Sequence, residues 1–141
     1  TVPTATGEWD TDYAAKVAAA LDVLKRHDFV ALHLEGPDEA THNHDLEHKI
    51  YSIERLSADV VAPVTEALRA AGEDFRLLLL SDHTTYMANG AHGADPVPFV
   101  LYDSRVSDGS GLPYSEANGA KGPYVDDGAQ LMDLLFELKK L

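Results

Sequence analysis

Three short clusters of aspartate and histidine carry the side chains best suited to chemistry in this chain. Asp38 and His42 are four residues apart, so one helical turn would place a carboxylate and an imidazole on the same side. Such a pair suits a divalent transition metal, because the carboxylate supplies negative charge and the imidazole supplies a nitrogen ligand. For this cluster alone, the alternative is a helix-capping aspartate beside a solvent-exposed histidine.

The second and third clusters flank short apolar runs. Ser81, Asp82 and His83 directly follow FRLLLL, and His92 precedes PVPFVLYD. Adjacent residues point to opposite faces of a strand, but where a strand meets a loop the backbone can turn both toward one site. The alternatives are an Asx-turn with a surface histidine and a loop histidine between small residues. Together the clusters predict metal ligands at Asp38, His42, Asp82, His83 and His92.

Two further polar residues, His33 and Glu35, stay open as supporting groups. His33 lies in a predicted strand, as either a buried imidazole or a group behind the ligands, and Glu35 is equally ambiguous. His44 and His48 are predicted to lie on the surface. The sequence has no GxGxxG or GxxxxGK[ST] loop and no GxSxG elbow, which argues against nucleotide binding and an α/β serine hydrolase.

The elements that must position these residues alternate between helices and short strands. Asp10 and Thr11 offer a helix cap, and Pro63 either kinks or divides the second helix, which Gly72 caps. Helices are expected up to residue 27, at 45–72 and around 131–138, and strands at 29–34, 75–80 and 99–102, with an irregular region at 103–127. The alternation favours an α/β sheet flanked by helices. Three strands make a narrow sheet, which indicates that part of it lies outside this chain.

Composition limits the classes of partner. The 141 residues fit one domain, here 1–141, and 45% hydrophobic residues support a folded core. The formal charge of −13 repels phosphate backbones, so nucleic-acid binding is not expected. No apolar run approaches the roughly 20 residues of a membrane span. There is no cysteine and no signal-peptide pattern, so we expect a cytoplasmic protein without membrane partners.

At these motifs the chain resembles the archaeal-type cofactor-independent phosphoglycerate mutases of the alkaline phosphatase superfamily. The resemblance is carried by HDFVALHLEGPDEATHNHDLEHKIYSIERL and LLLLSDHTTYMANGAHGADPVPFVLYD, with PDEAxH, DH and HxADPVPF in that order. The lead ATGEWDTDYAAKVAAALDVLKRHDFV is also similar, and residues 104–127 are least so. The resemblance implies an alkaline-phosphatase-like domain with a sheet flanked by helices. By that resemblance this chain is the C-terminal part of the domain, and the domain is incomplete without its N-terminal part.

The same resemblance implies a chemistry. Family members hold two divalent metal ions, most commonly manganese, with magnesium, cobalt or zinc as alternatives. By that resemblance Asp38, His42 and His92 would bind one ion, and Asp82 and His83 the other. The family transfers a phosphoryl group through an enzyme hydroxyl and so interconverts 3-phosphoglycerate and 2-phosphoglycerate in glycolysis and gluconeogenesis.

Several departures from the family pattern affect what this chain can do. Nothing matches the segment that carries the nucleophile, so the chain alone is expected to be inactive and to need the missing N-terminal part of the polypeptide as partner. The family's DHPTP is replaced at Thr84 and Tyr86, its Arg-Thr pair by Gly90-Ala91, and an Asp by Ser57. The alternatives are a phosphatase, phosphodiesterase or phosphonate hydrolase of the superfamily, and a non-catalytic metal-binding domain.

Metal affinity is predicted to depend on pH. An imidazole must be neutral to coordinate a metal, and free imidazole protonates at about pH 6.5. We therefore expect Mn²⁺ affinity to fall as the pH drops below roughly 6.5, as measured by calorimetric titration between pH 8 and pH 5. Equal affinity at both ends of that range would contradict imidazole ligation.

Overall fold

The computed structural model describes residues 2–106 and 109–137, which form a mixed α/β structure that is mostly helical with small sheets. The chain divides into two compact units. Unit 1 comprises Thr1–Gly72 and Thr85–His92, and unit 2 comprises Glu73–Thr84 and Gly93–Leu141. None of the described helices is both long enough and apolar enough to cross a membrane.

Unit 1 begins with helix α1 (Tyr13–Leu24), whose cap is not the predicted one. The Asp12 carboxylate accepts a hydrogen bond from the Ala15 N–H at 2.9 Å and so caps the helix. Thr11 cannot take this role, because its buried hydroxyl donates to the Thr6 carbonyl and accepts from the Thr6 N–H, both at 2.9 Å. The helix ends three residues before the predicted limit at His27 and buries Val17.

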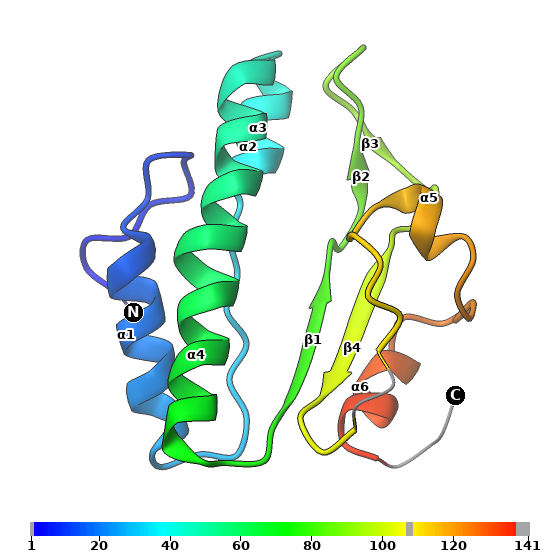
Figure 1. Cartoon of the computed structure of the whole chain (residues 1–141). Coiled ribbons are helices and arrows are strands. Elements are labelled where there is room, and N and C mark those ends of the chain that lie inside the picture. The colour runs from blue at the N-terminus through cyan, green and yellow to red at the C-terminus, as the bar shows by residue number, and fades with distance from the viewer. Residues whose placement is uncertain (1, 107–108, 138–141) are drawn as a thin grey trace. The chain divides into compact units, whose positions relative to one another are not determined.

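The second predicted helix is continuous through Pro63. It comprises α3 (Leu46–Arg55), the π-helical stretch η1 (Leu56–Val61) and α4 (Ala62–Ala71), which Figure 1 shows as one long ribbon. In the wide turn the Ala62 N–H donates to the Ser57 carbonyl, five residues earlier. The wide turn immediately precedes Pro63, which has no N–H to donate and whose ring would crowd an ordinary α-turn. Gly72 caps the end with a φ of 71°, as predicted.

Residues 29–34 do not form the predicted buried strand. They run in an irregular extended path from α1 to helix α2 (Gly36–His42), with exposed and half-buried side chains in alternation. A strand is defined by its backbone partners, and this segment belongs to neither of the paired sheets in the described part of the chain. Residues 29–34 therefore have the sequence pattern of a strand but no backbone pairing with a described strand, and the predicted strand is wrong.

Unit 2 contains the other two predicted strands. Strand β1 (Arg76–Leu80) pairs antiparallel with β4 (Phe99–Asp103), so that Arg76 lies opposite Asp103 and Leu80 opposite Phe99. Two-residue strands β2 (Thr84–Thr85) and β3 (His92–Gly93) form a separate small pair. The predicted irregular region contains the short helix α5 (Glu116–Gly119), and the last helix is α6 (Gln130–Leu135), which buries Leu131 and Leu134. Leu138 lies outside the described residues.

An ion-pair network joins the ends of β1, β4 and α6. The Arg76 guanidinium lies 2.8 Å from the Asp103 carboxylate and 2.7 Å from that of Glu137, and it donates to the Leu134 carbonyl at the end of α6 at 2.8 Å. Hydrogen bonds from Arg105, supplemented by Arg76, hold the pKa of Asp103 well below its ordinary range.

This network is expected to make the stability of unit 2 sensitive to acid. A depressed folded-state pKa stabilises the fold above the unfolded value of 3.8, and this stabilisation is lost as the pH falls through the folded value. The urea midpoint of unit 2, followed through the NMR signals of Tyr102, should therefore fall steeply below about pH 4. The variant Asp103→Asn should flatten this dependence, and an unchanged pH profile in that variant would contradict the assignment.

Candidate metal centre

Helix α2 places Asp38 and His42 on one side, as their spacing predicts. Pro37 lies in the first turn, where its missing N–H costs nothing, and Glu35 occupies the cap position. Asp38 is therefore inside the helix, and the alternative of a capping aspartate is wrong. Its carboxylate Oδ2 lies 3.1 Å from His42 Nε2.

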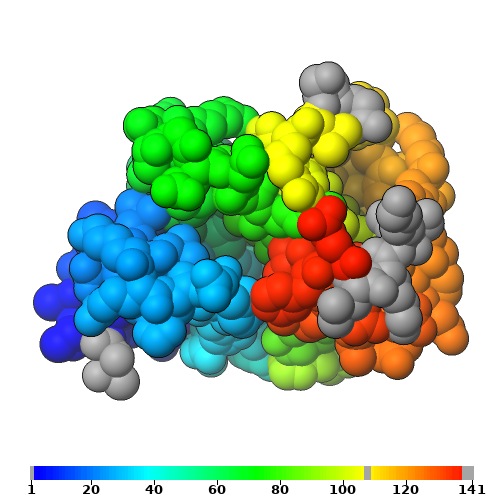
Figure 2. Space-filling view, turned by 90° about the horizontal axis from the view of Figure 1, so that it is seen from below, coloured from blue at the N-terminus to red at the C-terminus, as the bar shows by residue number. Residues whose placement is uncertain are grey.

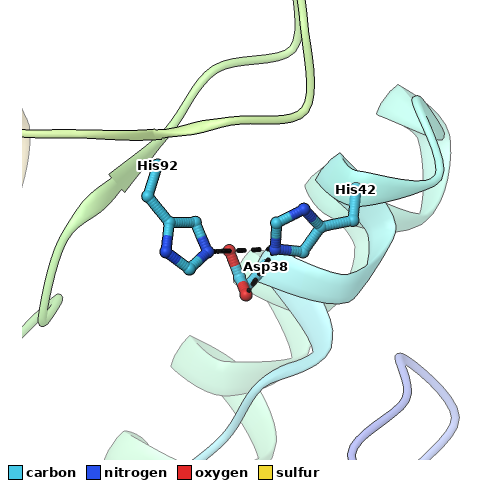
Figure 3. Close-up of side chains that lie close together, drawn as sticks. All are labelled: Asp38, His42 and His92. Atoms are coloured by element: carbon cyan, nitrogen blue, oxygen red, sulfur yellow. Dashed lines mark hydrogen bonds and ion pairs between the residues drawn. The ribbon is translucent and has the colours of Figure 1, made fainter.

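His92 from β3 completes a cluster of three side chains. Its Nε2 lies 3.0 Å from His42 Nε2 and 3.5 Å from Asp38 Oδ1, as Figure 3 shows. One ligand atom from each residue lies within 4.8 Å of the others. Residues 38, 42 and 92 all belong to unit 1, so this arrangement is fixed within one compact body.

A backbone carbonyl sets the tautomer of His42. His42 Nδ1 lies 2.7 Å from the carbonyl oxygen of Gly90. A carbonyl can only accept, so Nδ1 carries the hydrogen and the lone pair of Nε2 points toward Asp38 and His92. Gly90 adopts a φ of 65°, which favours glycine. At one of the positions where the chain departs from the family pattern, the backbone thus orients a candidate metal ligand.

Thr85 of β2 orients the carboxylate, a role that sequence reasoning missed. Its hydroxyl donates a short hydrogen bond to Asp38 Oδ1. Its own carbonyl accepts from Lys49 Nζ on α3 at 3.2 Å, which ties β2 to the long helix. The sequence shows only that Thr85 carries a hydroxyl three positions after Asp82. It does not show that this hydroxyl bonds to Asp38, which is 47 positions away.

The three donors fit a divalent ion. One carboxylate and two imidazoles are a common ligand set for zinc and other transition metals. The side chains are 29%, 38% and 50% exposed for Asp38, His42 and His92, so an ion can reach them. Among the described residues this is the one converging group of three metal-capable side chains.

Asp82 and His83 lie in unit 2, in the loop that follows β1 after Ser81. His83 Nε2 is 3.6 Å from Asp82 Oδ2, and the Asp82 carboxylate accepts from the His83 N–H at 3.0 Å. The loop therefore turns both side chains the same way, as expected at the end of a strand. Their assignment to a second metal ion stays a prediction.

The four other polar residues named from the sequence fall outside the cluster. His33 is exposed and lies 3.2 Å from the Glu35 carboxylate, so the buried-imidazole alternative is wrong. His44 is a surface residue, as predicted, and its Nδ1 contacts the Met87 carbonyl. His48 is half-buried instead of fully exposed, because it stacks on Trp9 with ring centroids 3.9 Å apart.

Thr85→Val is expected to weaken Mn²⁺ binding about tenfold, within the range known for groups that orient metal ligands. Valine has nearly the same shape but cannot hold the Asp38 carboxylate in place. Thr85→Ser keeps the hydroxyl and should bind metal like the unaltered chain. Calorimetric titration would measure all three chains, and equal affinities for the valine and serine variants would exclude this role.

Fold and site together define a mixed α/β protein with a carboxylate–imidazole cluster that fits a divalent ion. The profile described as "Metalloenzyme superfamily" matches residues 1–136, and the chain belongs to this superfamily. The predicted resemblance to phosphoglycerate mutases is also confirmed by individual relatives.

Two relatives and one solved structure illustrate the similarity. The chain is 41% identical over 135 residues to a probable 2,3-bisphosphoglycerate-independent phosphoglycerate mutase of Geobacter sulfurreducens, covering 94% of this chain and 34% of the relative. It is 44% identical to that of Methanothrix thermoacetophila, covering 95% and 34%. The PH0037 protein of Pyrococcus horikoshii matches with a TM-score of 0.79 and 26% identity, covering 96% of this chain and 40% of that one. The chain thus spans about a third of the length of these curated relatives.

Proposed function

We propose that this chain supplies the metal-binding part of a 2,3-bisphosphoglycerate-independent phosphoglycerate mutase, with phosphoglycerate as substrate. The observation that carries the proposal is the convergence of Asp38, His42 and His92 in a chain whose relatives bear that name. Cytoplasmic glycolysis and gluconeogenesis are the corresponding proposed setting.

The residues of this chain have defined tasks in that proposal. Asp38, His42 and His92 hold one divalent ion, and Asp82 and His83 contribute to a second, with manganese as the first candidate. Bound divalent ions neutralise charge on phosphoryl oxygens and favour a hydroxyl nucleophile. The Gly90 carbonyl keeps the His42 Nε2 lone pair available, and the Thr85 hydroxyl keeps the Asp38 carboxylate in place. No nucleophile is assigned in this chain, and the chain alone is proposed to be inactive.

A chimaeric enzyme tests the activity. The corresponding third of the Geobacter sulfurreducens relative would be replaced by residues 1–141, and turnover of 3-phosphoglycerate would be followed with Mn²⁺ and coupled enolase. Formation of 2-phosphoglycerate without release of phosphate supports the mutase. The matched control is the same chimaera with His42→Ala, which should be inactive.

One feature favours a hydrolase of the same superfamily as the second candidate. Gly90 and Ala91 stand where the resembling family carries Arg-Thr, so a cationic side chain that could hold the substrate anion is missing. In the chimaera, release of inorganic phosphate without 2-phosphoglycerate would favour that candidate. Absence of both products, with metal still bound, would favour a non-catalytic metal-binding domain.

A further inference from the structure

A histidine occupies the position at the end of α2 where helices usually carry glycine. The His44 N–H donates to the Thr41 carbonyl at 3.0 Å. The Asp45 N–H donates to the Ala40 carbonyl at 2.8 Å. These two bonds form a Schellman motif, which requires a left-handed residue directly after the cap. His44 has a φ of 57°, a conformation that costs free energy for a residue with a Cβ. Such strain is concentrated at functional sites, so the contacts of this side chain indicate what the strain maintains.

The His44 imidazole contacts the loop of residues 85–92, here called the hairpin loop. Its Nδ1 lies 3.0 Å from the carbonyl oxygen of Met87. A carbonyl can only accept, so Nδ1 carries the hydrogen and donates it. The loop also packs closely on the ring, because a Cβ added at Gly90 would lie 3.6 Å from His44 Cε1. Residue 44 and the hairpin loop belong to the same compact unit, so this contact is fixed within unit 1.

Two further donors attach the hairpin loop to the same pair of helices. His42 Nδ1 on α2 lies 2.7 Å from the Gly90 carbonyl. Lys49 Nζ on α3 donates to the Thr85 carbonyl at 3.2 Å. The carbonyl that His44 contacts lies between these two along the loop. The loop is therefore attached at three backbone carbonyls, and His44 makes the middle attachment.

Backbone hydrogen bonds within the hairpin loop connect these attachments to one another. The Tyr86 N–H donates to the Ala91 carbonyl at 3.0 Å, and the Gly90 N–H donates to the Tyr86 carbonyl at 2.8 Å. These bonds join the part of the loop that His44 holds to the part that ends at His92. An attachment at one point of the loop therefore restricts the position of the Gly90 carbonyl and of the His92 imidazole.

We propose that His44 is a positioning residue for the metal cluster. Its imidazole holds the hairpin loop against the end of α2. The loop in turn holds the Gly90 carbonyl on His42 Nδ1 and brings His92 to the ligands of α2. The effect on metal binding rests on the proposed function, whereas the effect on the orientation of His42 needs no metal and can be measured without one.

Glycine and asparagine at position 44 test this role. His44→Gly removes the imidazole and relieves the left-handed backbone. His44→Asn is tolerated in that conformation and carries an amide N–H the same number of bonds from Cα as Nδ1. In calorimetric titration, Mn²⁺ affinity should fall about tenfold in the glycine variant, the lower end of the range for groups that orient metal ligands. The asparagine variant should bind like the unaltered chain.

Thermal stability distinguishes positioning from a merely structural role. Because glycine relieves the strained backbone, the thermal midpoint of His44→Gly should equal or exceed that of the unaltered chain. The midpoint would be followed by the helical signal in circular dichroism. A residue that only held the fold together would lower the midpoint and the Mn²⁺ affinity in parallel.

A measurement without metal tests the orientation of His42. The ¹⁵N chemical shifts of its ring would be recorded at about pH 8, where an imidazole with the ordinary pKa is neutral. The unaltered chain and His44→Asn should carry the hydrogen on Nδ1, whereas His44→Gly should show a mixture of both tautomers. This signature does not depend on metal, so failure of the unaltered chain to bind Mn²⁺ would refute the metal centre alone.

His27→Gly is the control for loss of an imidazole from unit 1. Residues 25–29, which follow α1, are exposed, and Figure 2 shows this segment in light blue on the surface. The substitution should leave both Mn²⁺ affinity and the His42 tautomer unchanged. Three results would overturn the positioning role of His44: an unchanged tautomer in His44→Gly, equal losses of affinity in the glycine and asparagine variants, or a thermal midpoint that falls together with affinity.

Discussion

His42→Ala is expected to weaken Mn²⁺ binding about 100-fold or more, the largest effect of any single change in unit 1. His42 Nε2 is the donor that lies close to both Asp38 and His92, at 3.1 and 3.0 Å. Its removal leaves one carboxylate and one imidazole, too few donors to displace the hydration shell of a divalent ion. Because the side chain is 38% exposed and lies near the end of α2, the fold should survive.

The chain contains a matched control for this substitution. His33 and Glu35 form another histidine–carboxylate pair, 3.2 Å apart and exposed, without a third ligand among the described residues. His33→Ala should therefore leave calorimetric Mn²⁺ affinity unchanged. Equal losses in both variants, or no binding by the unaltered chain at millimolar Mn²⁺, would contradict the metal centre.

Arg76→Met is expected to lower the free energy of unfolding of unit 2 by about 2 kcal/mol. Methionine has a similar unbranched stem but no hydrogen-bond donor. The substitution would remove the donors to the Asp103 carboxylate and the Leu134 carbonyl, so the end of β1 would no longer be joined to α6. The Arg76 side chain is only 23% exposed, so water replaces these bonds incompletely.

Arg105→Met separates this effect from a general loss of positive charge. Arg105 also contacts Asp103 and Glu137, but its side chain is 44% exposed and donates to no carbonyl of α6. Its loss should cost less than the loss of Arg76 in urea unfolding followed through Tyr102. Equal losses would show that the contact of Arg76 with α6 contributes nothing.

The parts of the fold that local sequence determines could be predicted. Helical spacing indicated the long helix, and the apolar runs indicated β1 and β4 to within a residue. The strand at residues 29–34 could not be judged from its own pattern, because strand formation depends on a partner that sequence spacing does not reveal. The first helix was predicted to be capped by Asp10 or Thr11, but Asp12 caps it in the structure. Thr11 is not free to do so, because its hydroxyl accepts a hydrogen bond from the Thr6 N–H.

The site shows the same division between local and long-range information. The spacing of Asp38 and His42 was sufficient to place them together, and the strand-flanking position of His92 made it a candidate. The orienting groups, Thr85 and the Gly90 carbonyl, are 47 and 48 positions from their partners Asp38 and His42. A backbone carbonyl has no side-chain signature, so sequence reasoning cannot identify it as a partner.

The stacking of Trp9 on His48 gives the chain an internal optical probe. Trp9 is the single tryptophan of the sequence, and its ring lies 15° from the plane of the imidazole while Tyr51 contacts it edge-on. Separation of these rings changes the surroundings of the indole, so its emission spectrum records the melting of unit 1. Unit 2 contributes no indole signal, and the two units can therefore be followed independently in one sample by tryptophan fluorescence and by tyrosine NMR.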